Sequence, residues 1–257
     1  MTKATATTPE EFDRVIAEGV ALQEHLPWLQ MIAVGGTAAA MHARHRYSGD
    51  TDHVTLFLRE NFTVVAEELE RWPGWRTNRL NAPVLILGER HDVELGVRQS
   101  RRAVPYEIAR VRGLWVPTAP EALRIKAYVA ATRRATRDFV DVAALADLVG
   151  WDASLTALSY LNLLYEPVGN QTALTKFAEC CHQEPLDLER TDLSHYKGLR
   201  PPYDDWTVVR RTCRALASEL LVMEMESALP ATLDAITGSP EFQPNVLGTP
   251  RPRPAPP

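Results

Sequence analysis

Two aspartates with one residue between them, Asp50 and Asp52, lie in the segment DTDHVTLFL, which is rich in β-forming residues. Successive side chains of a strand point to opposite faces, so residues two apart share a face and the two carboxylates are expected side by side. Carboxylates held that close repel each other unless a cation lies between them. Mg²⁺ prefers a few carboxylates together with the phosphate oxygens of a substrate. The pair therefore indicates a site for Mg²⁺ (or Mn²⁺), and a solvated pair at a strand start is the alternative.

A glycine-rich turn precedes this pair. The apolar run 29–34 predicts a buried strand that ends at Gly35-Gly36, and Thr37 begins a segment that is predicted to be helical. Glycine lets the backbone come close to a ligand, and the first amides of a helix point at it without partners inside the helix. Gly35, Gly36 and the Thr37 hydroxyl are therefore expected to bind phosphate groups. Gly-Gly turns before helices are common, so the turn carries weight only together with the aspartates.

A second set of charged residues has helical spacing. Lys126, Arg133, Arg137 and Asp141 are seven, four and four residues apart, which places them on one stripe if the helix is continuous. The alternative is a solvated face, with Arg137 and Asp141 as an ion pair one helical turn apart. His42 and His45 are expected on the surface of an earlier helix.

Basic residues are concentrated in one part of the chain. Residues 98–137 contain ten Lys/Arg and two acids, although the whole chain has a net charge of −5. Such segregation predicts one face that meets a polyanion, or else a set of solvated surfaces. The residues expected to contact RNA are Arg98, Arg101, Arg102, Arg133 and Arg137.

The order strand, Gly-Gly-Thr, helix, Asp-x-Asp resembles the minimal nucleotidyltransferases of the polymerase-β type. The segments HRYSGDTDHV and KAYVAATRRATRDFVDVAAL are similar to motifs of the AbiEii-type nucleotidyltransferase toxins, which include the MenT toxins. The segment YKGLRPPYDDW is also similar to actinobacterial members of that family. The resemblance covers residues 30–215, which is most of the chain.

This resemblance implies an enzyme that transfers a nucleotide from a nucleoside triphosphate to RNA, with a tRNA 3′ end as the expected acceptor, and releases pyrophosphate. The enzyme would be the toxin of a toxin–antitoxin system, with a cognate antitoxin as partner, and would block translation. Catalysis would rest on Asp50 and Asp52 as metal ligands. A third carboxylate on a neighbouring strand would complete the metal site, with Glu94 preferred over Asp92.

The same resemblance assigns the nucleotide site. Lys126 is expected to contact the triphosphate, and Asp141 is expected to place Lys126, with Asp138 as the less favoured partner. The expected nucleotide-binding residues are Gly35, Gly36, Thr37, Ser48 and Lys126.

The elements that must hold these residues can be predicted in outline. Thr8-Pro9-Glu10-Glu11 predicts a capped helix start, and the first 116 residues read as mixed helix and strand. Expected strands are 29–34, 50–58, 83–88 and 91–97, and expected helices are 8–24, 37–46 and 61–71. From Thr118 to about residue 225 nearly every segment reads as helix. The expected fold is α+β: a polymerase-β-like nucleotidyltransferase domain with a mixed sheet (1–116), a mostly helical domain (117–238) and an extended Pro-rich tail (239–257).

Composition excludes several other classes. The chain has 257 residues, 45% of them hydrophobic and 24% charged, which is typical of a globular protein and not of a disordered one. It has no apolar run of membrane-spanning length, and its N-terminus lacks the apolar core of a signal peptide. Three cysteines cannot form a disulfide framework, so a reduced, cytoplasmic setting without a membrane partner is expected.

Two other functions fit the same motifs. One is a small-molecule nucleotidyltransferase of the antibiotic-modifying type, which needs an acidic pocket for a cationic acceptor, and the basic segment 98–137 argues against it. The other is a non-catalytic protein that binds RNA or a partner on the same fold.

Overall fold

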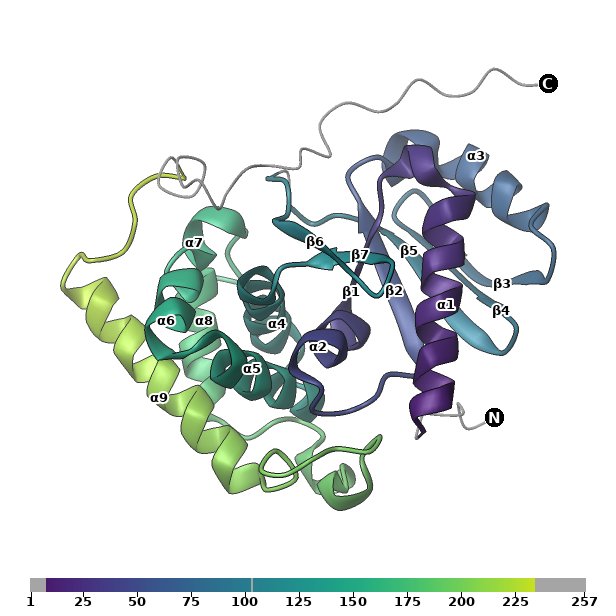
Figure 1. Ribbon diagram of the computed structural model, residues 1–257. Coiled ribbons are helices and arrows are strands. Elements are labelled where there is room, and N and C mark those ends of the chain that lie inside the picture. Colours follow the sequence, from purple (N-terminus) through teal and green to yellow (C-terminus); the bar gives the residue numbers. More distant parts are fainter. Residues whose placement is uncertain (1–7, 103, 234–257) are drawn as a thin grey trace. The chain divides into compact units, whose positions relative to one another are not determined.

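The computed structural model describes residues 8–102 and 104–233 (Figure 1). The described chain divides into two compact units, one with the described residues of 1–38 and 48–117, the other with 39–47 and 118–233. A mixed sheet in the first unit and helices in the second confirm the α+β class that the sequence predicts. The Pro-rich tail predicted at 239–257 lies outside the described residues.

The first unit begins with helix α1 (Pro9–His25). Its capping box is formed as the sequence predicts: Thr8 Oγ1 accepts from the Glu11 amide at 3.2 Å, and Glu11 Oε2 accepts from the Thr8 amide at 3.1 Å. The apolar face of the helix buries Phe12, Ile16 and Leu22. Near its end, the Gln23 side chain exchanges two hydrogen bonds with the backbone of Trp115, which ties α1 to the last strand of the unit.

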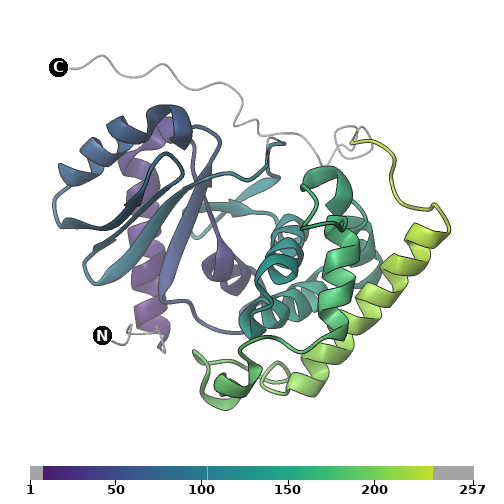
Figure 2. The same cartoon turned by 180° about the vertical axis from the view of Figure 1, so that it is seen from behind.

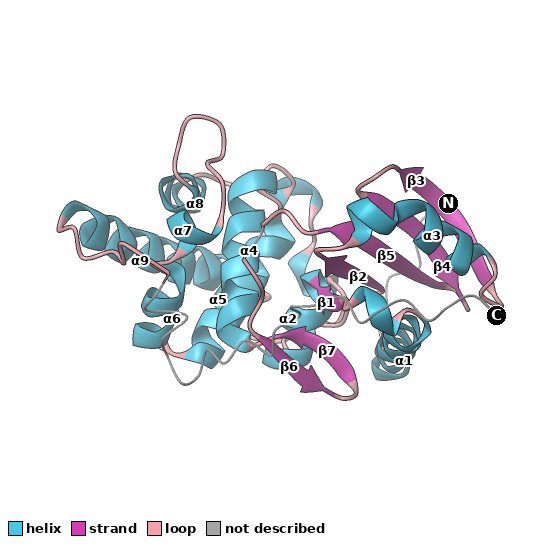
Figure 3. Cartoon of the chain, turned by 90° about the horizontal axis from the view of Figure 1, so that it is seen from above, coloured by secondary structure: helices cyan, strands magenta, loops and turns pink. Residues whose placement is uncertain are grey.

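A five-stranded mixed sheet forms the centre of this unit (Figure 3, magenta). Its strand order is β1-β2-β5-β4-β3, in which β2 and β5 are parallel and all other neighbours are antiparallel. The strands are β1 (Ile32–Val34), β2 (Asp50–Thr55), β3 (Trp75–Asn81), β4 (Leu85–Arg90) and β5 (Val93–Gln99). The other elements are η1 (Pro27–Leu29), α3 (Leu58–Glu70) and a hairpin of β6 (Ile108–Val111) and β7 (Leu114–Pro117). Helix α2 (Gly35–Ala43) begins in this unit, and its residues from 39 on belong to the second unit.

The sequence pattern predicts neither β3 nor the β6–β7 hairpin. In β3, an edge strand, only Trp75 is buried, so no run of alternating apolar residues marks it. The first predicted strand is also too long, because Pro27–Leu29 forms a 3₁₀ turn and extended backbone begins at Ile32.

The second unit consists of helices (Figure 2, seen from behind). They are α4 (Ala119–Arg133), α5 (Thr136–Val149), α6 (Trp151–Leu158), α7 (Leu161–Leu164), α8 (Ala173–His182), α9 (Trp206–Met225), η2 (Leu188–Arg190) and η3 (Leu193–His195). Helix α4 packs against α5, α6 and α8, and α9 covers α5 and α8. Leu123, Phe139, Phe177 and Leu216 lie in the resulting core.

The continuous helix assumed for the charged stripe does not exist. Arg134 adopts a left-handed conformation with φ of 51°, which ends α4, and α5 begins two residues later. Thr136 starts the new helix by donating both its amide and its hydroxyl to Asp187 Oδ1, at 2.7 and 2.8 Å. The prediction of one stripe from Lys126 to Asp141 is therefore wrong.

No helix among the described residues is both long enough and apolar enough to cross a membrane. Cys180, Cys181 and Cys213 are buried free thiols of the helical unit.

Candidate active site

Asp50 and Asp52 lie on the same face of β2, as their spacing predicts. Thr51, His53 and Thr55 are buried on the opposite face, whereas the two aspartates are half-buried. His53 is fully enclosed, and burial lowers the pKa of its ring to about 4. The strand therefore separates a neutral packed histidine from an acidic face that solvent can reach.

Glu94 is the carboxylate of β5 that shares this acidic face. Asp50 is paired with Glu94 in the parallel register, and residues paired in this way point to the same side of a sheet. Asp92 is exposed in the turn before β5, where its φ is 63°, so it lies outside the strand that carries Glu94. Of the two candidates for the third carboxylate, Glu94 is the one that the sheet places beside the pair.

Gly96 makes room for Asp52. The two residues are paired across β2 and β5, and a Cβ atom at Gly96 would collide with Asp52 Oδ1 and lie 3.0 Å from a methyl group of Leu87. Any larger residue would therefore displace the carboxylate. The Arg98 side chain follows on the same face of β5, and its Nε donates to Asp52 Oδ1 at 3.0 Å.

Two hydroxyl groups hold Asp50 in place instead of facing a ligand. Thr37 is buried and its Oγ1 donates to the Asp50 carbonyl oxygen at 2.5 Å. Ser48 is also buried, and its Oγ lies 3.1 Å from Asp50 Oδ1. In this structure both hydroxyl groups contact Asp50, and nucleotide binding by Thr37 and Ser48 stays a prediction.

The turn at the start of α2 keeps its backbone accessible. Gly35 has φ of +71°, a conformation that glycine adopts without strain, and a Cβ atom there would meet nothing within 4 Å. Gly36 follows it, and both residues are half-exposed. The backbone at this turn is open to a ligand, and phosphate binding there stays a prediction.

Lys126 lies in a buried ionic cluster of the helical unit. Its Nζ is 3.0 Å from Asp138 Oδ1 and 2.6 Å from Asp141 Oδ2, so Lys126 forms ion pairs with both aspartates that the sequence analysis considers as its partners. Lys126 is only 4% exposed and the two carboxylates are completely buried. Burial acts to lower the pKa of Lys126, but the carboxylates of Asp141 and Asp138 outweigh it and raise the pKa above its usual value.

His45 and Arg46 complete this buried ionic cluster, and sequence reasoning missed both. Arg46 donates to the two oxygens of Asp141 through Nε and Nη2, at 2.7 and 2.8 Å, and His45 Nε2 lies 2.7 Å from Asp141 Oδ1. Burial lowers the pKa of His45, so its neutral ring donates to the carboxylate. The surface position expected for His45 is wrong. The only signal in the sequence was the His-Arg pair shortly before the aspartates.

Of the arginines predicted to contact RNA, three are exposed and two have other partners. Arg101, Arg133 and Arg137 are exposed, and Arg98 is bound to Asp52. Arg102 is 5% exposed, donates to the carbonyls of residues 104 and 105, and stacks on Tyr106 with 4.0 Å between its guanidinium carbon and the ring centroid. Arg102 is therefore a structural residue, and the expectation that it contacts RNA is corrected.

The acidic face of β2 and β5 is suited to a divalent cation that shares its ligands with a substrate. The described residues contain no group of three His, Cys, Asp or Glu side chains that could hold a metal ion by themselves, so an ion at this face would also need ligands from its substrate. Asp50 and Asp52 offer oxygen ligands only, on a half-buried face, and the missing side chain at Gly96 leaves Asp52 its space. This set fits Mg²⁺ or Mn²⁺, which complete their coordination with phosphate oxygens and water.

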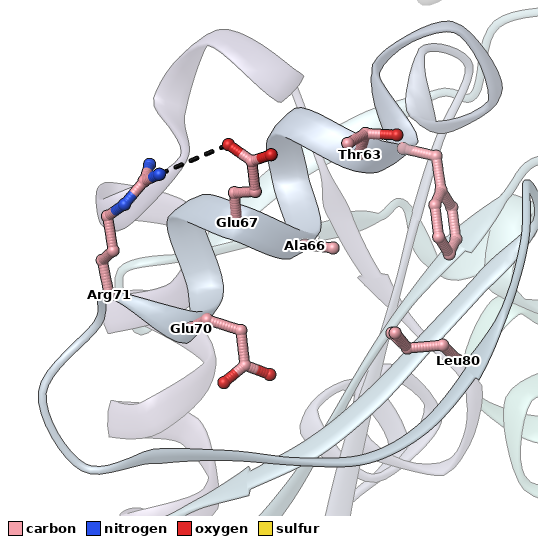
Figure 4. Close-up of a pocket in the computed structure, with 7 residues that line it drawn as sticks. Thr63, Ala66, Glu67, Glu70, Arg71 and Leu80 are labelled. Atoms are coloured by element: carbon pink, nitrogen blue, oxygen red, sulfur yellow. Dashed lines mark hydrogen bonds and ion pairs between the residues drawn. The ribbon is translucent and has the colours of Figure 1, made fainter.

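An open groove of about 380 Å³ lies elsewhere in the first unit, between α3 and β3 (Figure 4). Phe62, Ala66 and Leu80 form its apolar lining, and the Glu67–Arg71 ion pair lies at its edge. None of the predicted site residues lines this groove.

No family model matches the chain. A curated relative, the mycolic acid-containing lipids exporter MmpL11 of Mycolicibacterium smegmatis, is 27% identical over 155 residues, which cover 57% of this chain and 16% of the exporter. The chain thus spans about a sixth of the length of the curated relative that it matches.

Several solved structures are similar to this chain. JHP933 from Helicobacter pylori has a TM-score of 0.49 and 14% identity, and the match covers 86% of this chain and 96% of that one. MenT4, a nucleotidyltransferase toxin from Mycobacterium tuberculosis H37Rv, has a TM-score of 0.45 and 16% identity, with coverage of 83% and 87%. An antigenic nucleotidyltransferase-like protein from Paracoccidioides brasiliensis has a TM-score of 0.42 and 13% identity, with coverage of 92% and 100%.

Proposed function

We propose that this chain is a metal-dependent nucleotidyltransferase, which transfers a nucleotide from a nucleoside triphosphate to RNA and releases pyrophosphate. The observation that carries the proposal is the pair Asp50 and Asp52 on one face of β2, beside Glu94 of β5. The open Gly35-Gly36 turn adds a place for phosphate groups within the same unit. The motif resemblance extends the proposal to a cytoplasmic toxin that acts on a tRNA 3′ end and is countered by a cognate antitoxin.

In this proposal Asp50 and Asp52 hold Mg²⁺ or Mn²⁺, with Glu94 as the adjacent third carboxylate. The ion, when bound, would neutralise phosphate charge and lower the pKa of the attacking hydroxyl. The hydroxyl of the RNA end loses its proton to water, its oxygen forms a bond to the α-phosphorus, the bond from the α-phosphorus to the bridging oxygen breaks, and pyrophosphate leaves. Thr37 and Ser48 act as positioning residues, because their hydrogen bonds fix the backbone and carboxylate of Asp50. Such chemistry depends on positioning and electrostatics more than on a protein nucleophile.

Lys126 keeps the role that the resemblance implies, namely contact with the triphosphate. Its ammonium group is held by Asp138 and Asp141, so contact with a phosphate oxygen requires Lys126 to exchange one carboxylate for the ligand. Asp141 then serves as the residue that places Lys126. Exposed Arg101, Arg133 and Arg137 remain the proposed contacts to the RNA backbone.

The decisive experiment incubates the purified protein with each α-labelled nucleoside triphosphate, Mg²⁺ and either total RNA or an aminoglycoside. Label in small RNA is the expected result, and label only in the aminoglycoside would indicate the antibiotic-modifying type. No transfer with any acceptor would overturn the enzymatic proposal and favour a binding protein.

Matched variants assign the carboxylates in the same assay. Asp50→Ala and Asp52→Ala are expected to abolish transfer and leave the fold intact, because each removes one charge from a crowded acidic pair. Glu94→Ala is expected to reduce transfer strongly, whereas Asp92→Ala, which removes an exposed turn carboxylate, serves as the control. Full activity of the Asp50 and Asp52 variants would mean that the pair is a solvated surface feature.

A further inference from the structure

Arg98 is the cationic partner of the acidic face. It lies on β5 two residues after Gly96, so its side chain emerges on the face that also carries Glu94. Its Nε donates to Asp52 Oδ1 at 3.0 Å, and the Arg98 and Asp52 side chains are 34% and 30% exposed. The sequence analysis expects Arg98 to contact RNA, but in the structure its partner is Asp52, a proposed metal ligand.

The contact is built by the local sheet geometry. Because Gly96 has no side chain, nothing on β5 separates Asp52 from the arginine that follows it. The strand register fixes the position of Arg98 relative to Asp52. Asp52 is paired with Gly96, and Arg98 is paired with Val54, the next residue of β2 on the same face.

The Arg98 guanidinium on Asp52 Oδ1 and a divalent cation bound to the same carboxylate repel each other, so the two cations compete for Asp52. We propose that Arg98 is a positioning residue that occupies Asp52 in the ligand-free enzyme and is displaced from it when a divalent cation binds. This inference rests on the proposed function and adds a step to it, because metal binding becomes an exchange of cations at Asp52. In the ligand-free protein Arg98 supplies a positive charge to Asp52, and in this way it weakens metal binding in the absence of nucleotide.

The expected size of the effect follows from the exposure of the pair. Because the Arg98–Asp52 ion pair is partly exposed, it competes only modestly with a metal ion for Asp52, even with its charge-assisted hydrogen bond. Removing the guanidinium should therefore tighten metal binding about three- to tenfold. Arg98→Lys keeps a cation near Asp52 and should remain close to the wild type. Arg79→Gln, which removes an exposed arginine from β3 of the same sheet, controls for the general change in net charge.

The test is a titration of the nucleotide-free, full-length protein with Mn²⁺, followed by the electron paramagnetic resonance signal of the free ion. Arg98→Gln is expected to bind Mn²⁺ about three- to tenfold more tightly than the wild type, with Arg79→Gln unchanged. The gain should disappear in the double variant Arg98→Gln/Asp52→Asn. Circular dichroism spectra and thermal unfolding of each variant check that Mn²⁺ binding is compared among folded proteins.

The outcomes separate this inference from the proposed function. If Asp50→Ala and Asp52→Ala weaken Mn²⁺ binding but Arg98→Gln leaves it unchanged or weaker, the metal site stands and the role of Arg98 is overturned. An equal gain in the Arg79→Gln control would also overturn it, because the effect would then be one of net charge. If neither the wild type nor Arg98→Gln binds Mn²⁺, both the metal site and the exchange are refuted.

Discussion

Replacing Asp141 with asparagine removes the carboxylate at the centre of the buried ionic cluster. In the wild type this group accepts from Arg46 Nε and Nη2 at 2.7 and 2.8 Å, from His45 Nε2 at 2.7 Å, and from Lys126 Nζ at 2.6 Å. All of these side chains are buried. With neutral His45, two cations balance the carboxylates of Asp141 and Asp138. The substitution therefore leaves two buried cations with one carboxylate.

The expected loss of stability is large. Breaking a buried ion pair by removing one partner costs about 3–5 kcal/mol, because the remaining charge stays buried without compensation. Lys126 retains Asp138, and an asparagine oxygen can still accept one hydrogen bond, so we expect a loss near the lower limit, about 3 kcal/mol. That is a substantial part of the roughly 5–15 kcal/mol that stabilises a typical domain.

Stability against pH provides a second readout. Burial acts to raise the pKa of Asp141, but Arg46, Lys126 and the hydrogen bonds from His45 and Arg46 outweigh it and hold the pKa well below its usual value. A carboxyl group whose pKa is lowered on folding contributes stability that is present above its unfolded pKa, about 3.9, and is lost as the pH falls further. The wild type should therefore lose stability in acid more steeply than Asp141→Asn.

The assay is equilibrium urea unfolding at several pH values between 7 and 3, followed by circular dichroism. Asp147→Asn is the matched control, since Asp147 is exposed on the same helix and accepts from the Tyr203 hydroxyl in a surface hydrogen bond at 2.9 Å. We expect less than about 1 kcal/mol from the control. A similarly small effect for Asp141→Asn, or an unchanged acid slope, would refute the argument that this carboxylate neutralises the cluster.

Three further predictions concern single residues. Gly96→Ala should displace the Asp52 carboxylate and lower both Mn²⁺ affinity, measured by titration, and nucleotide transfer, measured by label incorporation, at least tenfold. Wild-type values would show that β5 shifts to make room for the methyl group and leaves Asp52 in place. Lys126→Met should lower transfer by orders of magnitude and also destabilise the helical unit by about 3 kcal/mol in urea unfolding, since it leaves buried carboxylates short of a cation. Arg101→Gln should reduce the salt dependence of RNA binding with little change in stability. Arg102→Gln should instead reduce the melting temperature with little change in the salt dependence of RNA binding, because Arg102 is buried. The reverse pattern would contradict the structural role of Arg102.

Local sequence rules predicted several features that the structure confirms. The Thr8 capping box starts α1, because its residues satisfy one another within a single turn. Asp50 and Asp52 share a face because side chains alternate along any strand, whatever surrounds it. The mixed α/β character of the first 116 residues and the helical character of the later ones also follow from hydrophobic periodicity over short windows.

Features that depend on contacts between distant segments were beyond the sequence. No Gly or Pro marks the helix break at Arg134, so the periodicity of the sequence is compatible with one continuous helix through it. Lys126, Asp141 and Arg46 come together only because α4 packs on α5 and because residues 39–47 belong to the helical unit.

The same holds for the partners of the acidic face. That Glu94 lies beside Asp50, and that Arg98 reaches Asp52, is set by the parallel register of β2 and β5, two strands that are far apart in the sequence. Side-chain alternation says which way a residue points along its own strand. Only the pairing of strands in the folded sheet decides what lies next to it, because that pairing depends on the packing of the whole unit.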